Sequence, residues 1–183
     1  GIKMTVWAFA KITNENVRKE VYESIKKGKS RFGWSKKDED DLRKTWNGEQ
    51  AFLLRIKPGD WIIHVNMPKQ GKCVVAKVIG EYDFDDGIPC SWGSDFRHNI
   101  AIDVASIIEF DRNSEEVLPN VNLKPRQRYM RVHAKDDFLQ SIENLKTNAV
   151  SNKKSKNESK ELFFLKEKTD GIKEINSSYS RKS

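Results

Sequence analysis

The sequence lacks the features that mark several large classes of protein. Among its 183 residues there are only two cysteines, Cys73 and Cys90, which argues against a disulfide framework or a cysteine zinc site and favours a reducing, cytoplasmic location. No apolar run approaches the roughly 18 residues that a membrane-spanning helix needs. We therefore expect no membrane partner.

The motifs of common enzymes are missing as well. There is no glycine-rich phosphate loop, no Gly-x-Ser-x-Gly elbow, and no HExxH or Cys-x-x-Cys pair. Acidic runs at residues 38–41 and 83–86 are typical of a solvated helix start and a turn. Asp60, Asp103 and Lys77 could be combined into a metal-dependent nuclease site, but their spacing is not distinctive. We expect a binding domain without catalytic residues, metal or cofactor, and rank a small nuclease last.

The positive charge is concentrated towards the end of the sequence. The net charge is +7, yet residues 146–183 hold 10 basic and 5 acidic residues, which leaves 24 basic and 22 acidic residues over 1–145. Any nucleic-acid face of the folded part must therefore come from local clustering. Residues 148–160 read as an Asn-, Lys- and Ser-rich linker. We expect one domain over 1–145 and a basic linker or tail over 146–183, with a possible small docking element at 161–165.

Hydrophobic periodicity predicts short strands and a few helices. A strand over 5–12 is followed by a helix that Thr13 or Asn14 caps, that repeats valine and isoleucine every fourth residue, and that ends at Gly28. This mixture indicates an α+β fold built on a mixed barrel. The remaining pattern predicts a helix over 35–47, strands over 61–65, 73–79, 99–108 and 129–133, a loop over 82–97, and a last helix over 135–145.

Two tryptophans occupy stretches without periodicity. Trp34 follows a glycine-containing segment, and Trp92 lies within a polar loop. Large aromatic residues in surface loops can sandwich a flat base, although both rings could equally fold back on the core as lids. Trp7 and Trp61 lie within strands and Trp46 at a helix end, so we expect these three to pack in the core.

The order of these motifs resembles that of the YTH domains. Residues 6–35 contain a strand, the helix Asn-Glu-Asn-Val-Arg-Lys-Glu-Val-Tyr-Glu-Ser-Ile, and then Phe-Gly-Trp-Ser, like the opening of that family. Residues 61–104 are similar too, with a glycine hairpin, Val-Val-Ala-Lys-Val, a tryptophan loop and a closing strand. By this resemblance Trp34 and Trp92 are two walls of a methylated-base cage. The third wall would come from Phe96, Phe32 or Trp61.

The related EVE family shows a similar plan. Its Lys-x-Gly-Asp turn resembles Lys57-Pro58-Gly59-Asp60, and its Ala-x-Asp-Val strand resembles residues 101–104. The resemblance covers roughly residues 5–133 and implies a PUA-like mixed β-barrel flanked by short helices. It also implies that polar contacts to the base come from the end of the first strand and from the cage loop, for which Lys11, Asn14 and Ser35 are the candidates.

Basic residues lie near both ends of this region. Such groups can hold phosphates and position a nucleic-acid strand without reading its sequence, or they can be a solvated surface with no role. The candidate phosphate-binding residues are Lys27, Lys29, Arg31, Arg97, Lys124, Arg126 and Arg128.

Together these observations predict a reader of nucleic acid that carries a modified base. The resemblance favours DNA, a flipped-out base, and a role as the targeting module of a modification-dependent restriction or defence system, which implies a fused or partner nuclease. A reader of methylated RNA is the alternative on the same fold. From a different class, the alternative is a regulatory protein-interaction module whose aromatic residues only fill a core.

Overall fold

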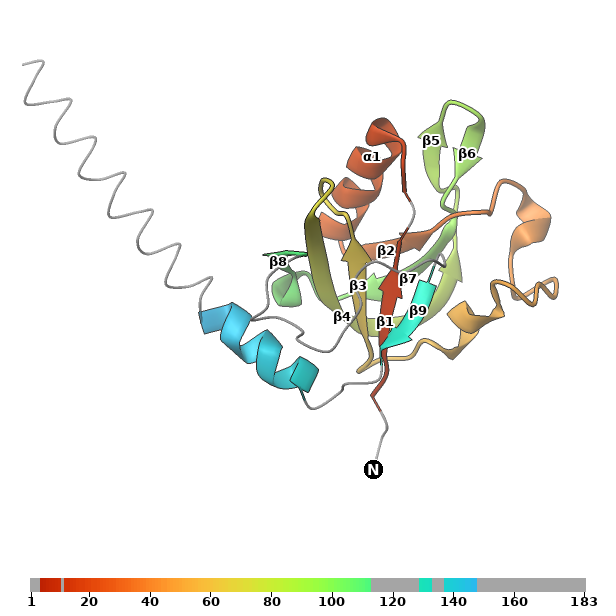
Figure 1. Cartoon of the computed structure of the whole chain (residues 1–183). Helices are drawn as coiled ribbons and strands as arrows, with labels where there is room; N and C mark the ends of the chain where they lie inside the picture. The colour runs from red at the N-terminus through yellow and green to blue at the C-terminus, as the bar shows by residue number, and fades with distance from the viewer. Residues whose placement is uncertain (1–3, 11, 113–128, 133–136, 148–183) are drawn as a thin grey trace, which may run out of the picture. The chain divides into compact units, whose positions relative to one another are not determined.

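The fold is α+β, with a seven-stranded sheet, a two-stranded ribbon and two α-helices among the described residues (Figure 1). The computed structural model describes residues 4–10, 12–112, 129–132 and 137–147, with the backbone alone over 129–132. The chain divides into compact units of residues 1–142 and 143–183, and the description below concerns the first. The strands are β1 (Val6–Phe9), β2 (Lys29–Phe32), β3 (Trp61–Val65), β4 (Lys72–Phe84), β5 (Ile88–Cys90), β6 (Gly93–Asp95), β7 (His98–Ile102), β8 (Ile108–Asp111) and β9 (Tyr129–Val132). The helical elements are α1 (Glu15–Lys26), the 3₁₀ turns η1 (Asp38–Asp40), η2 (Ala51–Arg55) and η3 (Val104–Ser106), and a helix over 137–147.

Helix α1 confirms the expectation from the sequence. Asn14 caps it, because the side-chain oxygen accepts hydrogen bonds from the first free backbone N–H groups at 2.9 and 3.1 Å. Val17, Val21 and Ile25 recur on one face and are buried against the sheet. Gly28 follows with a φ of +97°, the left-handed conformation that commonly ends a helix.

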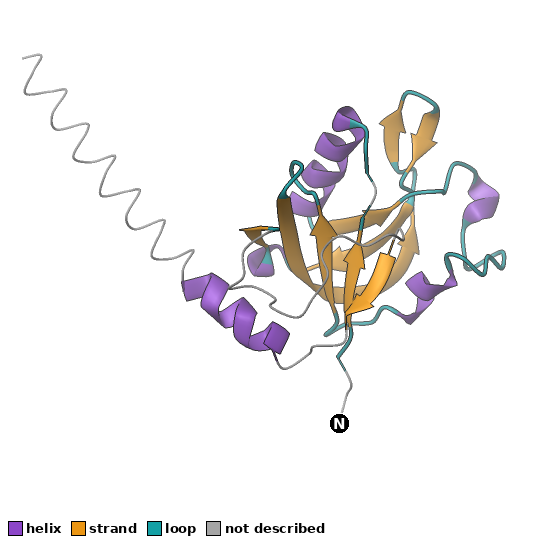
Figure 2. Ribbon diagram, in the orientation of Figure 1, coloured by secondary structure: helices purple, strands orange, loops and turns teal. Residues whose placement is uncertain are grey.

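The large sheet runs in the order β2-β7-β4-β3-β1-β9, with β8 also paired to β4. Strands β1 and β3 are parallel and the other pairs are antiparallel. The sheet curves strongly (Figure 2). Part of the bend lies in β4, whose register with β7 shifts between Val78 and Tyr82. Gly80 lies in this shift, and a Cβ there would be only 3.0 Å from the Ala101 Cβ.

The two ends of this strand order are not joined. Among the described strands no pairing links β2 to β9. The α+β class is therefore confirmed, whereas the closed PUA-like barrel stays a prediction.

Two apolar clusters make up the core, and they meet on one face of the sheet, because Ile62 of the first lies directly across from Ala76 of the second. Strand β3 is buried along its whole length. One includes Trp7, Phe9 and Phe52, and the other lies between the sheet and α1. Trp7 and Trp61 are 2% and 6% exposed, so core packing is confirmed for both.

The predicted helix over 35–47 is wrong. The structure has only η1 and tight turns there, because acidic side chains bond to nearby backbone N–H groups and compete with a helix. Asp41 accepts from the Arg43 N–H at 3.0 Å and so forms a local turn, whereas Asp40 accepts from the Lys37 N–H at 3.0 Å and caps only the short η1. Trp46 is consequently 81% exposed, and its expected place in the core is also wrong.

Two other segments differ from the sequence-based expectation. The stretch expected to be a loop over 82–97 contains the end of β4 and the β5–β6 hairpin. The strand expected over 99–108 is broken by η3, because the Asp103 side chain accepts from the Ala105 N–H at 3.0 Å and starts a turn.

A chain of buried hydrogen bonds holds the segment that replaces the predicted helix. The Leu42 N–H donates to the Tyr82 hydroxyl at 3.1 Å. The hydroxyl lies 2.6 Å from His98 Nδ1, and His98 Nε2 lies 2.7 Å from Gln50 Oε1. Since Gln50 Oε1 only accepts, Nε2 carries the proton, Nδ1 accepts, and His98 is neutral. Burial lowers the pKa of His98 to about 4 and that of His64 to about 3.

We predict that acidification destabilises the fold before most carboxylates titrate. Both histidines stay neutral in the folded chain, whereas an unfolded histidine gains a proton below about pH 6.5. The free energy of unfolding should therefore fall by about 1 kcal/mol per pH unit for each histidine between pH 6.5 and 5. Denaturant unfolding across this range measures the slope. The variant His98→Asn should lose about half of it, and an unchanged slope would show that His98 is not buried as a neutral group.

Candidate functional site

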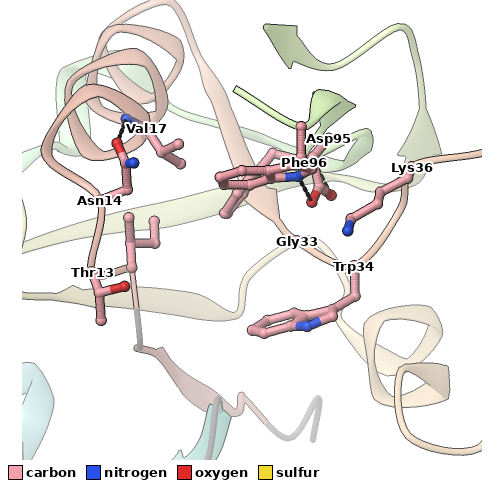
Figure 3. A pocket seen from close by; sticks show the side chains of 10 residues that line it. Thr13, Asn14, Val17, Gly33, Trp34, Lys36, Asp95 and Phe96 are labelled. Atoms are coloured by element: carbon pink, nitrogen blue, oxygen red, sulfur yellow. Dashed lines mark hydrogen bonds between the residues drawn. The ribbon is translucent and has the colours of Figure 1, made fainter. Parts of the chain in front are cut away.

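A pocket of about 180 Å³ lies where three segments meet: the start of α1, the loop after β2, and the β5–β6 hairpin (Figure 3). Trp34 stands in the loop after β2, and Trp92 lies at the turn of the hairpin. The structure thus brings both tryptophans to one pocket although they are 58 positions apart in the sequence. The residues that line it are Ile12, Thr13, Asn14, Val17, Gly33, Trp34, Lys36, Trp92, Asp95 and Phe96.

The two indoles remain accessible to solvent. Trp34 is 38% exposed and Trp92 is 45% exposed, so neither is a closed lid over the core. Trp34 has a φ of +61°, and its ring rests on Phe32 with the ring centroids 5.6 Å apart. A positive φ is strained for a bulky residue and is most often retained at functional sites.

Phe96 closes the inner end of the pocket. It is 9% exposed and also has a positive φ, +56°. Gly33 lies against its ring, and a Cβ on Gly33 would come within 3.2 Å of the Phe96 ring. Glycine at position 33 therefore leaves the space that the ring fills.

Asp95 connects the walls of the pocket. Its Oδ1 accepts from the Ser35 N–H at 3.0 Å and the Phe96 N–H at 2.7 Å. Its Oδ2 accepts from the indole N–H of Trp92 at 2.9 Å, the bond drawn to Asp95 in Figure 3. One carboxylate therefore fixes the loop after β2, the backbone of the inner wall and the orientation of Trp92.

The predicted base-edge residues have different positions. Ser35 is fully buried, and its hydroxyl accepts from the Arg97 and His98 N–H groups, so it holds the loop after β2, and its contact with a base stays a prediction. Asn14 lines the pocket; its Oδ1 caps α1, which leaves its amide NH₂ for a ligand. Lys11 lies outside the described residues.

Arg31 supports the fold around the pocket, and its phosphate contact stays a prediction. It is 8% exposed, and its guanidinium donates to Ser24 Oγ, the Phe96 carbonyl and both oxygens of Asp85 at 2.7–2.8 Å. Burial acts to raise the pKa of Asp85, but hydrogen bonds from Arg31, the Gly87 N–H and Lys29 outweigh it and hold that pKa well below its usual range. Lys29 is bound to the same carboxylate at 3.0 Å.

The other candidate phosphate-binding residues do not form a single cluster beside the pocket. Arg97 pairs with Asp38 and lies over the Phe84 ring, so its guanidinium is already engaged. Lys27 is exposed but follows the far end of the 12-residue α1, roughly 18 Å from Asn14 at about 1.5 Å per residue. The three remaining candidates, Lys124, Arg126 and Arg128, lie outside the described residues.

Sequence reasoning missed several residues of the pocket, including Gly33, Lys36 and Asp95. Asp95 could have been noticed, because it stands three residues after Trp92 and beside Phe96. Lys36 carries no motif that distinguishes it from other surface lysines. The aspartates of the nuclease alternative have structural partners instead: Asp60 binds Lys57 and Trp7, and Asp103 caps η3.

Within the described part of the chain, no group of three His, Cys, Asp or Glu side chains could hold a metal ion. In that same part, no helix combines the length and the apolar character required to cross a bilayer.

Comparison with known proteins yields little. The sequence matches no family model and no curated protein. Among solved structures, the chain is similar to protein Atu2648 from Agrobacterium tumefaciens, a structural-genomics target. The two are 12% identical, the alignment covers 76% of this chain and 91% of that one, and the TM-score is 0.37. A likeness this distant carries no argument about function.

We predict that Arg31 contributes to stability and not to salt-dependent binding. The variant Arg31→Met leaves the Phe96 carbonyl without its guanidinium donor, and the partly buried Asp85 carboxylate keeps only Lys29 and the Gly87 N–H. It should therefore lower the free energy of unfolding by about 2–4 kcal/mol in denaturant titrations. Lys27→Met, at the exposed end of α1, is the matched control and should change it by no more than about 0.5 kcal/mol. If the Arg31→Met protein is stable but binds nucleic acid more weakly, Arg31 contacts a phosphate and this prediction is wrong.

Proposed function

We propose that this chain reads a modified base in nucleic acid, by binding the base between Trp34 and Trp92 and without chemistry of its own. The observation that carries the proposal is the pocket that both exposed indoles line. Stacking on aromatic side chains contributes about 1–3 kcal/mol per base. A methyl group on the base adds apolar burial and displaces water from the same pocket.

The size of the pocket supports a single flat ring. An apolar cavity of about 150 Å³ accommodates benzene, whereas pockets for drug-sized ligands enclose roughly 300–1,000 Å³. The volume here, about 180 Å³, lies near the lower of these values. A base must leave its stack to enter such a pocket, so the substrate is a flipped-out or single-stranded nucleotide.

Polar groups at the pocket match the needs of a base edge. The Asn14 amide NH₂ donates, the Thr13 hydroxyl donates or accepts, and Asp95 Oδ2 has a further lone pair beside its bond to Trp92. A site that satisfies the polar edge of its ligand discriminates against ligands that lack that edge.

We propose that the curved sheet is the wall of a PUA-like barrel of the YTH/EVE kind, with the pocket near the start of α1. DNA is the preferred nucleic acid and RNA the alternative on the same fold. The domain would then direct a fused or partner nuclease of a restriction or defence system to modified sites.

The alternative of a protein-interaction module with a purely structural cluster is less well supported. Core tryptophans of this chain, Trp7 and Trp61, are at most 6% exposed, whereas Trp34 and Trp92 are 38% and 45% exposed.

We predict that the pocket tryptophans can be replaced at little cost to folding. Trp34→Ala and Trp92→Ala should each weaken binding to a modified oligonucleotide by about 1–3 kcal/mol and change unmodified binding less, since backbone contacts dominate there. Titrations and thermal melts measure the two effects. Trp46→Ala removes a tryptophan outside this pocket and should change neither. A loss of about 3–5 kcal/mol of stability without selective loss of binding would instead identify the two rings as core residues.

The remaining phosphate candidates can be tested through salt. If Arg126 or Arg128 contacts a phosphate, replacing it with alanine should lower the slope of log affinity against log salt by roughly 0.7–0.9. Isothermal titration at several salt concentrations gives this slope, with Lys27→Ala as the comparison. A slope that stays constant in both arginine variants would remove these contacts from the proposal.

A further inference from the structure

The carboxylate of Asp95 is buried without a counter-ion in the described part of the molecule. Asp95 is 4% exposed, and its three donors are two backbone N–H groups and an indole N–H. None of them carries a positive charge. Buried charges are normally paired, because an unpaired one loses its hydration without replacement.

A second aspartate of the same chain shows how the pairing is usually completed. Asp60 is fully buried and accepts from the indole N–H of Trp7 at 3.2 Å, as Asp95 does from Trp92. Asp60, however, also binds the Lys57 ammonium at 3.0 Å. Both aspartates therefore accept a hydrogen bond from an indole N–H. Only Asp60 also forms an ion pair with a lysine.

A cation already approaches this pocket from its rim. The ammonium of Lys36 lies 5.8 Å from the centroid of the Trp92 ring. Figure 3 shows its side chain pointing into the space between Asp95 and Trp34. Indole is the side chain that attracts cations most strongly through its ring face. Lys36 is exposed, and a lysine ammonium on its four-carbon stem can leave such a position for solvent.

We propose that the pocket prefers a positively charged base, namely an adenine or cytosine that is methylated on a ring nitrogen and is cationic at neutral pH. This inference rests on the proposed function and names its ligand class. Such a base, for example 1-methyladenine or 3-methylcytosine, presents a flat ring to the two indoles and a positive charge to Asp95. It takes the place of the Lys36 ammonium, which is the stand-in cation of the empty pocket.

One feature of the fold opposes a cation. The N-terminus of α1 also reaches the pocket, and a helix N-terminus carries roughly half a positive charge. Here Asn14 caps it, and Glu15 lies in its first turn. The full negative charge of Asp95 exceeds this partial charge, so the pocket retains a net preference for cations.

The test compares constitutional isomers that differ in charge. Single-stranded oligonucleotides, as DNA and as RNA, carry 1-methyladenine or its neutral isomer 6-methyladenine, and 3-methylcytosine or its neutral isomer 5-methylcytosine, beside unmodified strands. We expect each cationic isomer to bind about tenfold tighter than its neutral partner, a difference of about 1.4 kcal/mol. The smallest preference that agrees with the proposal is about threefold. The DNA and RNA series separate the two sources of the same base chemistry.

Two variants test whether the charges of Lys36 and Asp95 set the preference for a cationic base. Lys36→Met removes the competing cation and should raise the affinity for the cationic isomer by about threefold or more. The same change should not strengthen binding of the neutral isomer. Asp95→Asn removes the charge, so the ratio of cationic to neutral affinity should fall towards one. A mere displacement of Trp92 would weaken both isomers equally and leave the ratio unchanged. Circular dichroism of each variant checks that it is folded.

The outcomes separate this inference from the proposed function. The charge preference is overturned if neutral isomers bind as tightly as the cationic ones and better than unmodified strands. The proposed function, recognition of a modified base, would still stand in that case. If no modified strand exceeds its unmodified control, both proposals fall. Binding of a trimethyl-lysine peptide in place of the oligonucleotides would overturn both and identify a reader of protein cations.

Discussion

A single buried carboxylate organises the pocket, and the positions of its walls depend on it. Asp95 accepts the N–H groups of Ser35 and Phe96 and the indole N–H of Trp92, so it links the loop after β2 to the β5–β6 hairpin. The Ser35 hydroxyl adds a second link between the same segments, because it accepts the Arg97 and His98 N–H groups. A pocket that is organised before the ligand arrives loses less entropy on binding.

The layer of polar contacts beneath the pocket supports the same segments. Ser35 accepts the N–H groups of Arg97 and His98, and Arg31 holds the Phe96 carbonyl and Asp85. His98 continues the chain to Tyr82 and Gln50. Buried polar networks of this kind specify a unique geometry when every member is satisfied. Several basic and polar residues that the sequence offers as ligand contacts, such as Arg31 and Ser35, are hydrogen-bonded within this network instead.

The charges that remain at the pocket are therefore few and informative. Asp95 faces it with a negative charge that only neutral donors stabilise, and the Lys36 ammonium lies over Trp92. The contrast with Asp60, which binds both an indole and a lysine, distinguishes an aspartate that completes a core from one that still attracts a cation. This electrostatic difference connects the reader proposal with its charge preference.

The sequence alone determined those elements whose physics is local. Helix α1 follows from its valine and isoleucine spacing, its Asn14 cap and Gly28, and the burial of Trp7 follows from an apolar strand. The absence of periodicity around Trp34 and Trp92 left a pocket and a core position equally open, and only the resemblance to YTH domains favoured both as pocket walls. The same reasoning failed over residues 35–47, where aspartate side chains compete for the backbone, and so misplaced Trp46. Only the tertiary structure decided which polar residues are free for a ligand, because the contacts of Ser35 with Asp95 and Arg97, and of Arg31 with Phe96, join residues 60 to 65 positions apart in the sequence.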